Sequence, residues 1–309
     1  METIIITGGA GFIGSHLCEA LVSDYKVICI DNFITGRKKN VAHLLTNKNF
    51  VLIEHDVTKP IKIDENVKYI FHMASPASPI DYQLRPIETM LANSFGAYNM
   101  LEMAKEKNAR ILLASTSEVY GDPKEHPQKE TYWGNVNSIG PRSCYDESKR
   151  FAEALAMSYR KEHDVDVRLA RIFNTYGPRM RENDGRVIPN FITQALQNKP
   201  ITACGDGSQT RSFCYVSDLV EGLKRFMFKD SLSGEVINIG NPEERTILET
   251  AKIVKQIIGS SSEIIFKELP QDDPLRRNPD ISKAKKLLAW APKISFEAGL
   301  KKTIEYFRN

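Results

Sequence analysis

Hydrophobic residues along this chain gather in short continuous runs. The first run, TIIIT at Thr3–Thr7, is rich in β-branched residues, as expected of a strand buried on both faces of a parallel sheet. Six further strands are expected at KVICI, FVLIEHDV, VKYIFHMAS, ARILLASTS, RIFNTYGPR and EVINIG. Helix-like or turn-rich segments separate them. This alternation predicts an α/β fold, a Rossmann-like doubly wound parallel sheet that binds its ligand at the carboxyl ends of the strands.

The length of 309 residues allows one large α/β domain and a smaller one. We predict that residues 1–173 form a cofactor-binding Rossmann domain, to which residues 213–241 return with the seventh strand. Residues 174–212 and 242–309 are predicted to form a smaller C-terminal substrate-binding domain. Two helices are expected in this smaller domain: Ile247–Ile258 and Ser282–Leu288.

Charge and cysteine usage restrict the function class. The net charge is only +3, and basic and acidic residues are interleaved, so we expect neither a nucleic-acid surface nor a nucleic-acid partner. The five cysteines are scattered and odd in number, which indicates reduced thiols and a cytoplasmic protein. The histidines show no zinc-like spacing, so no metal is expected. A signal peptide and an apolar run of about 18 residues are both lacking, so no membrane contact is expected.

Glycines directly after the first strand indicate a dinucleotide. Gly8, Gly11 and Gly14 are spaced G-x-x-G-x-x-G, and Gly9, Gly11 and Gly14 also satisfy G-x-G-x-x-G. Such glycines let a pyrophosphate approach the backbone at a helix N-terminus, where free N–H groups favour anions. A glycine-rich turn without a ligand is the alternative. The order of strand, glycines, helix, strand and terminal Asp31 argues against it.

Asp31 favours NAD over NADP. It follows Gly11 by twenty residues, the offset expected of a carboxylate that holds the adenosine ribose hydroxyls. A carboxylate there would repel a 2′-phosphate, although Arg37 keeps NADP open. Asp56 follows the third strand and meets the adenine or caps a helix. The other positions expected on the cofactor side are Phe12, Ile13, Asn32, Gly36, Val57, Ala74, Ser75 and Asn93, of which Asn93 is equally compatible with a polar core position.

The stretch Ser115–Lys149 carries the candidate chemistry. Tyr145 and Lys149 are four residues apart on an expected helix, so they share one face. A tyrosine acts as a general base near neutral pH only if its pKa falls by about three units, which corresponds to about 4 kcal/mol. Lys149 and an oxidised nicotinamide together could supply that much. A Tyr-x-x-x-Lys pair is a weak signal alone, but Thr116 at the end of the preceding strand supplies a hydroxyl beside it.

Several motifs give the chain a family resemblance over nearly its whole length. TGGAGFIGSH, STSEVYG and YDESK resemble the extended short-chain dehydrogenase/reductase family. HMASPASP, YWGNVNSIGPRSCYDESKR, GDGSQTRSFCYVSDLV and DDPLRRNPDI resemble more narrowly the branch that decarboxylates UDP-sugars. Ser138 and Ser148 stand where that branch would have Pro and Gly. The resemblance implies catalytic NAD and a UDP-sugar substrate that is oxidised at C4, loses CO2 and is reduced again.

Glu118 separates this branch from its relatives. Related 4,6-dehydratases carry an Asp-Glu pair here, whereas this chain has Ser117 before Glu118. Simple 4-epimerases generally lack the carboxylate, so a single Glu fits proton management at C5 without a leaving hydroxyl. A solvated loop carboxylate is the bland alternative. From another class, an NAD-binding module without catalysis is also considered, but the intact Thr116, Tyr145 and Lys149 argue against it.

Substrate contacts are expected in the second half of the chain. A nucleotide diphosphate favours bidentate guanidinium donors, which makes Arg186 and Arg211 candidates. The resemblance implies a nucleotide contact at Asn174 and Tyr215 and a contact of the sugar carboxylate with Arg277. The sequence does not settle whether Arg276 or Arg277 points inward. The family also implies a homodimer packed through two helices: Thr89–Lys107 and Tyr145–Arg160.

Overall fold

The computed structural model describes residues 1–308. Its main sheet is parallel and seven-stranded in the order β11-β6-β5-β4-β1-β2-β3, so the predicted Rossmann-like fold is confirmed. The strands span Thr3–Thr7 (β1), Lys26–Asp31 (β2), Phe50–Glu54 (β3), Val67–His72 (β4), Arg110–Thr116 (β5), Val167–Ile172 (β6) and Val236–Ile239 (β11).

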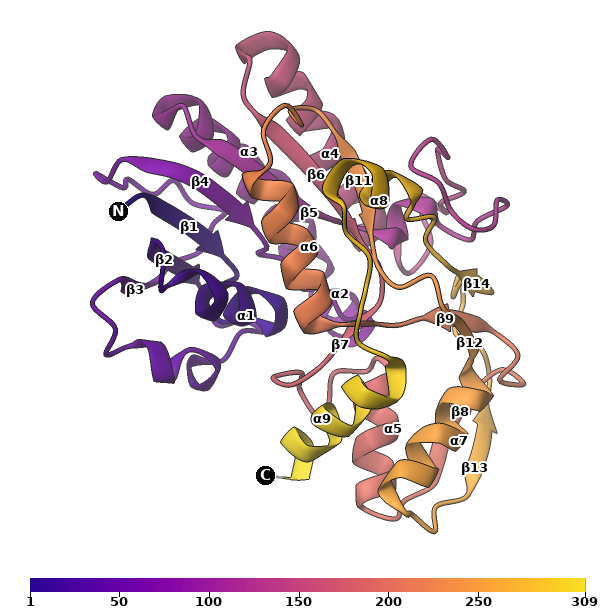
Figure 1. Cartoon of the computed structure of the whole chain (residues 1–309). Helices are drawn as coiled ribbons and strands as arrows, with labels where there is room; N and C mark the ends of the chain where they lie inside the picture. The colour runs from indigo at the N-terminus through magenta and orange to yellow at the C-terminus, as the bar shows by residue number, and fades with distance from the viewer. Residues whose placement is uncertain (309) are drawn as a thin grey trace.

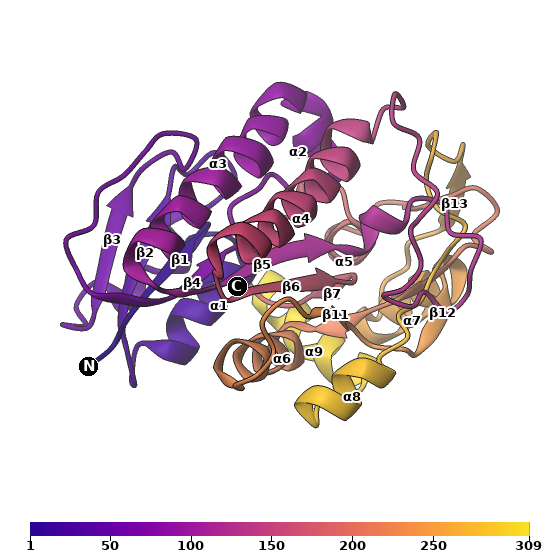
Figure 2. The same cartoon turned by 90° about the horizontal axis from the view of Figure 1, so that it is seen from above.

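Helices cover both faces of this sheet (Figures 1 and 2). On one face lie α3 (Pro86–Lys107) and α4 (Ser143–His163), and on the other α1 (Phe12–Leu21) and α6 (Val216–Phe228). Because both faces are covered, the strands are rich in apolar residues, and β1 is buried at all five positions. A short helix, α2 (Pro79–Leu84), links β4 to α3. Three 3-10 helices lie at Lys38–Asn40 (η1), Ala42–Leu44 (η2) and Ser117–Tyr120 (η3).

A smaller part of the molecule lies beyond the carboxyl ends of the strands (Figure 1). Its helices are α5 (Val187–Leu196), α7 (Ile247–Ile258) and α9 (Phe296–Arg308). Thr246 and Glu249 form a capping box that begins α7, which stabilises the helix by satisfying its first N–H groups. The short strands are β7 (Thr175–Tyr176), β8 (Ile201–Cys204), β9 (Thr210–Ser212), β10 (Cys214–Tyr215), β12 (Glu244–Thr246), β13 (Ile264–Lys267) and β14 (Arg276–Arg277).

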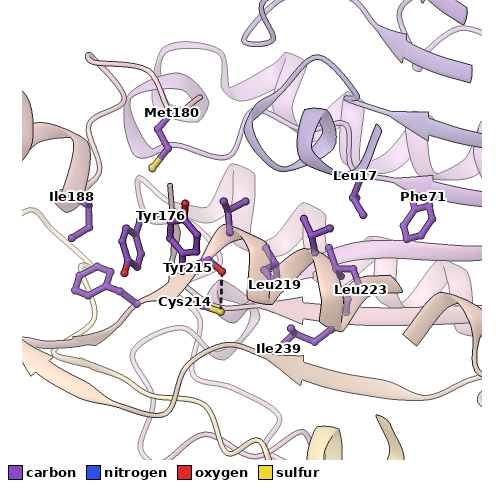
Figure 3. Packing of buried hydrophobic residues seen from close by; sticks show 14 of the residues in the cluster. Leu17, Phe71, Tyr176, Met180, Ile188, Cys214, Tyr215, Leu219, Leu223 and Ile239 are labelled. Carbon is purple, nitrogen blue, oxygen red and sulfur yellow. Dashed lines mark hydrogen bonds between the residues drawn. The ribbon is translucent and has the colours of Figure 1, made fainter. Parts of the chain in front are cut away.

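One apolar core joins the two parts (Figure 3). It extends from Leu17 and Phe71 in the large part, through Leu219 of α6, to Tyr176 and Ile188 near the smaller part. Helix α8 (Ser282–Leu288) packs on α6 and β11 rather than on α5 or α7. The division into two domains therefore stays a prediction, and the segment holding α8 belongs spatially with the large sheet.

Candidate active site

The turn after β1 has the close packing that a dinucleotide site requires. Gly8 has φ +66°, and a Cβ there would lie 2.8 Å from the backbone of Ala74. A Cβ on Gly14 would lie 2.2 Å from the carbonyl oxygen of Gly8. Only glycine fits at such separations. The turn therefore brings the N-terminus of α1 to a cleft of about 630 Å³ at the strand ends, where backbone N–H groups favour an anion.

Asp31, at the end of β2, lines the same cleft. One carboxylate oxygen accepts a hydrogen bond from the backbone N–H of Ala10 at 2.9 Å and the other from that of Phe33 at 2.8 Å. Burial raises the pKa of Asp31, and these backbone hydrogen bonds oppose the rise. Each oxygen keeps a lone pair for a hydroxyl donor. Arg37, the feature that kept NADP open, instead donates to the backbone carbonyls of Arg179 and Met180.

Most of the positions expected on the cofactor side line this cleft. Asp56 lines the cleft, and its carboxylate accepts a hydrogen bond from the backbone N–H of Thr58 at 3.0 Å. The position of Asp56 is therefore compatible both with stabilising the local turn and with contacting a ligand. The other predicted positions in the lining are Phe12, Ile13, Asn32, Val57, Ala74, Ser75, Thr116, Glu118, Tyr145, Lys149, Asn174, Arg186 and Arg211.

Four predicted positions do not line the cleft directly. Asn93 is buried and donates to Ser148 Oγ at 2.9 Å, which is the polar core position left open as its alternative. A Cβ on Gly36 would lie 2.6 Å from the carboxylate of Asp31, so Gly36 packs directly against this carboxylate. Tyr215 packs against Tyr176 in the apolar core (Figure 3). Arg277 lies behind Glu118.

Tyr145 and Lys149 share the face of α4 that meets the end of β5. Lys149 Nζ lies 5.8 Å from the centroid of the Tyr145 ring and donates to the carbonyl of Ala114 at 2.7 Å. Burial raises the pKa of Tyr145, against a hydrogen bond with Thr116 and the charge of Arg186. Burial also lowers the pKa of Lys149 to about 8. Lys149 alone therefore does not bring the phenol to neutrality, and the expected lowering requires the second cation.

Glu118 lies in η3, immediately after β5. The Thr116 hydroxyl oxygen caps η3 by accepting from the backbone N–H of Glu118 at 3.2 Å. The carboxylate pairs with Arg142 and, at 3.2 Å, with Arg277. Burial would raise the pKa of Glu118, but the charges of Arg277 and Arg142 outweigh it and lower the pKa to about 2. The alternative of a solvated loop carboxylate is therefore wrong.

The choice between the two adjacent arginines follows from a short strand pairing. In β14, Arg277 lies opposite Arg211 of β9, and Arg276 lies opposite Thr210. Successive side chains of a strand point to opposite faces. Arg277 is accordingly 1% exposed and donates to the carbonyl of Ser117 and to Glu118, whereas Arg276 is exposed.

Three residues of the site were not predicted from the sequence. Tyr82 of α2 stacks on Tyr145, with ring centroids 5.0 Å apart and planes 7° apart. Arg142, the residue before α4, pairs with both Glu118 and Asp273. Asp273 also pairs with Arg211 at 2.8 Å. Arg142 and Asp273 lie within the motifs YWGNVNSIGPRSCYDESKR and DDPLRRNPDI, which do not reveal their partners, and Tyr82 lies three residues beyond HMASPASP.

The GDP-mannose 4,6 dehydratase family matches residues 5–303. The chain belongs to this family. Similar curated proteins include UDP-glucuronic acid decarboxylase 1 of Xenopus tropicalis, which is 56% identical over 308 residues, covering 99% of this chain and 72% of that protein. UDP-glucuronic acid decarboxylase 1 of Arabidopsis thaliana is 57% identical over 307 residues, covering 99% and 70%. The resemblance to the extended short-chain dehydrogenase/reductases is confirmed.

Solved structures extend the likeness to other chemistries on this fold. UDP-glucuronic acid 4-epimerase of Bacillus cereus, in complex with UDP-glucuronic acid and NAD, matches with a TM-score of 0.89 and 30% identity, covering 99% of both chains. dTDP-glucose 4,6-dehydratase of Bacillus anthracis, in complex with NAD, matches with a TM-score of 0.88 and 26% identity, covering 100% of this chain and 97% of that one.

Residues 1–308 lack two other kinds of feature. No helix in that range has the length and apolarity needed to cross a membrane. No group of three or more His, Cys, Asp or Glu side chains in that range is arranged to hold a metal ion.

Proposed function

We propose that this chain is an NAD-dependent UDP-glucuronate decarboxylase that forms UDP-xylose and CO2. The observation that carries the proposal is Glu118 after Ser117, held between Arg142 and Arg277 beside Tyr145. A 4,6-dehydratase needs a second acid to expel the C6 hydroxyl, and Ser117 does not supply one. Relatives that are more than half identical over 99% of the chain bear this enzyme's name.

NAD fits the glycine turn and Asp31, and when bound it supplies the hydride acceptor and donor for C4. The absence of side chains at Gly8 and Gly14 lets a pyrophosphate approach the N-terminus of α1. Asp31 accepts from the adenosine ribose hydroxyls. Because the hydride returns to the sugar after CO2 is lost, the reaction consumes no external reductant.

Tyr145 acts as the general base of the oxidation. Its phenolate oxygen takes the proton of the C4 hydroxyl, while Thr116 holds that hydroxyl through a hydrogen bond. The ammonium of Lys149 stabilises the phenolate electrostatically, because a cation about 4 Å away at intermediate dielectric contributes about 4 kcal/mol. The same phenol returns the proton when C4 is reduced again.

Glu118 and the arginines around it act on the acid group of the sugar. Oxidation at C4 makes the sugar a β-keto acid, so its carboxylate leaves as CO2 and the electrons remain in an enolate. Arg142 lines the cleft and binds the carboxylate before that step, whereas Arg277 lies behind Glu118 and pairs with it. The charges of Arg277 and Arg142 favour the ionised form of Glu118 by lowering its pKa, so Glu118 positions a water that gives its proton to C5, and solvent reprotonates the hydroxide left behind. Sharing Arg142 with the substrate raises the basicity of Glu118.

A UDP-glucuronate 4-epimerase is the second candidate, favoured by the structural match to the Bacillus cereus enzyme. An epimerase also binds an acidic sugar and also oxidises C4, so acid recognition does not separate the two. Loss of CO2 does. An epimerase retains the carboxylate and returns hydride to the opposite face of C4.

The test is to incubate the purified protein with UDP-glucuronate and follow CO2 and the sugar by NMR, without added NADH. We expect UDP-xylose and CO2 in equal amounts. Formation of UDP-galacturonate without CO2 would replace the proposal by the epimerase. A lasting 4-keto sugar would indicate an oxidative decarboxylase. Tyr145→Phe with NAD retained should lower kcat by about 10²- to 10⁴-fold, and near-normal turnover would remove Tyr145 from the role of base.

We further propose a homodimer packed through α3 and α4. Exposed apolar side chains on these helices include Phe95 and Tyr98 of α3 and Phe151 of α4, and the two helices pack side by side (Figure 2). A contiguous apolar surface of this kind favours association. Sedimentation at micromolar concentration should give twice the chain mass, and Phe95→Glu should give the single-chain mass. A single-chain mass for the parent would contradict the proposal.

We also propose a cytoplasmic location. All five cysteines are free thiols, as expected in a reducing compartment. Cell fractionation tests this, and recovery in an oxidising compartment would contradict it.

A further inference from the structure

Asp273 occupies a position between two arginines of the cleft. Its carboxylate lies 2.8 Å from Nη2 of Arg211 and 3.3 Å from Nη1 of Arg142. All three residues line the cleft. The side chains of the two arginines are each 10% exposed, while that of Asp273 is 26% exposed. Asp273 is thus the part of this ion-pair group that faces solvent.

The charges around Glu118 do not balance. Arg142, Arg211 and Arg277 carry three positive charges, whereas Glu118 and Asp273 carry two negative ones. These ion pairs therefore leave one positive charge unpaired. Asp146, a further carboxylate near Arg142, has its pKa raised to about 8 by burial and by the charge of Glu118. One further carboxylate from a ligand neutralises the unpaired positive charge, and a ligand that brought its carboxylate to Arg142 would compete there with Asp273.

Asp273 sits in a loop that can exchange it for a ligand. Leu269, Pro270, Gln271 and Pro274 of this loop also line the cleft. The loop is held on its other side by Asp272, whose carboxylate accepts from the Asn137 side chain at 2.9 Å. Asp272 thus contacts Asn137 and no arginine, whereas the neighbouring Asp273 pairs with Arg142 and Arg211.

We propose that Asp273 is a specificity-determining residue: in the free protein its carboxylate occupies the position at Arg142 that the sugar carboxylate takes when the substrate binds. Arg142 also pairs with Glu118, which follows the strand end where the sugar reacts, so Arg142 lies at the sugar end of the cleft. A sugar with a carboxylate displaces Asp273 from Arg142. A neutral sugar leaves Asp273 paired, and the loop then remains against the arginines. The inference rests on the proposed function for the identity of the acidic sugar.

This exchange gives the reaction a direction for ligand release. The substrate carries the carboxylate and the product does not, because the group departs as CO2. Once it has left, Asp273 pairs again with Arg142, and the neutral product has no carboxylate to displace it. Asp273 therefore weakens acidic ligands by direct competition and has little effect on neutral ones through Arg142.

The test compares the affinities of two nucleotides in a Tyr145→Phe background, which prevents turnover. Dissociation constants for UDP-glucuronate and UDP-xylose are measured by calorimetry with and without Asp273→Asn. We expect the substitution to tighten UDP-glucuronate by about fivefold, the upper range for a partly exposed ion pair. UDP-xylose should change by less than about twofold. Asp272→Asn is the matched control and should leave both constants unchanged.

The outcomes separate a charge role from a structural one. Equal tightening of both nucleotides would overturn the assignment to the sugar carboxylate, and weakening of both would show that Asp273 only positions the arginines. Asp273→Ala must move the two constants in the same directions as Asp273→Asn. If the protein with Tyr145 intact releases no CO2 from UDP-glucuronate, the proposed function fails. If CO2 is released and Asp273→Asn changes neither dissociation constant, this inference alone fails.

Discussion

Replacing Glu118 by Gln should destabilise the protein strongly, because it leaves two buried guanidinium groups without their shared carboxylate. The pKa of Glu118 is lowered from 4.5 to about 2, and one pKa unit corresponds to about 1.4 kcal/mol. The folded protein therefore favours the ionised form by about 3 kcal/mol. The usual cost of breaking a buried ion pair by removing one partner is about 3–5 kcal/mol, so the two figures agree.

The pH dependence of this stabilisation has a definite sign. The pKa of Glu118 is depressed in the folded state, so the stabilisation is complete above the unfolded value of 4.5 and is lost as the pH falls toward 2. The difference between Glu118→Gln and the parent should thus be the same at pH 6 and pH 8. Below pH 4.5 it should shrink.

The assay is urea-induced unfolding followed by tryptophan fluorescence at pH 6 and pH 8. Glu147→Gln is the matched control, because Glu147 lies 3.5 Å from Arg150 in an ion pair whose side chains are 37% and 39% exposed. Such a pair contributes about 1 kcal/mol or less. If Glu118→Gln lowered the free energy of unfolding by no more than Glu147→Gln does, the ion-pair reasoning would be refuted.

Three further predictions concern the cofactor turn, the lysine and the packing of the C-terminal segment. Gly14→Ala should abolish the copurified cofactor, as measured by absorbance. Gly259→Ala, where no atom lies within 4 Å of the added Cβ, should retain the cofactor. Cofactor bound to both variants would contradict the close packing at Gly14. Burial lowers the pKa of Lys149 to about 8, so kcat/KM should fall as the pH rises above that value and Lys149→Arg should move this limb upward; an unmoved limb would assign it to another group. Asp218→Ala should lower the free energy of unfolding, measured in urea, by about 2–4 kcal/mol. The reason is that two backbone N–H groups, which donate to the Asp218 carboxylate at 2.9 and 2.8 Å, lose their acceptor. A loss below about 1 kcal/mol would contradict this estimate.

The sheet and the cofactor turn could be predicted because their signals are local. A strand buried on both faces must be apolar at every position, and the glycines at positions 8 and 14 are required by separations within a few residues or to a neighbouring strand. The helix α7 could be placed for the same reason, since Thr246 and Glu249 cap it from within the segment.

The rest of the site could not be predicted, because its partners are far apart in the chain. Arg142 meets Asp273 across 131 residues, and Arg277 meets Glu118 across 159. No periodicity marks a charged residue in a loop as a partner of another. The same limit applies to Tyr215, because its aromatic ring fits a ligand contact and a core equally well in sequence. It also applies to the helix at Ser282–Leu288, whose neighbours depend on the return of β11 to the sheet.

The two-residue pairing of β14 with β9 constrains which insertions this chain tolerates. Its alignment is set from the C-terminal side, where Asn278 exchanges backbone and side-chain hydrogen bonds with Gln128. A residue gained or lost within 268–274 would change the loop length and leave Arg277 inward. Deletion of Arg277 would instead shift the strand by one place and move Arg276 to the position opposite Arg211, toward Glu118. Because the two arginines are adjacent, a guanidinium would then still pair with Glu118. Changes of chain length on the N-terminal side of β14 therefore need not remove the positive charge beside Glu118.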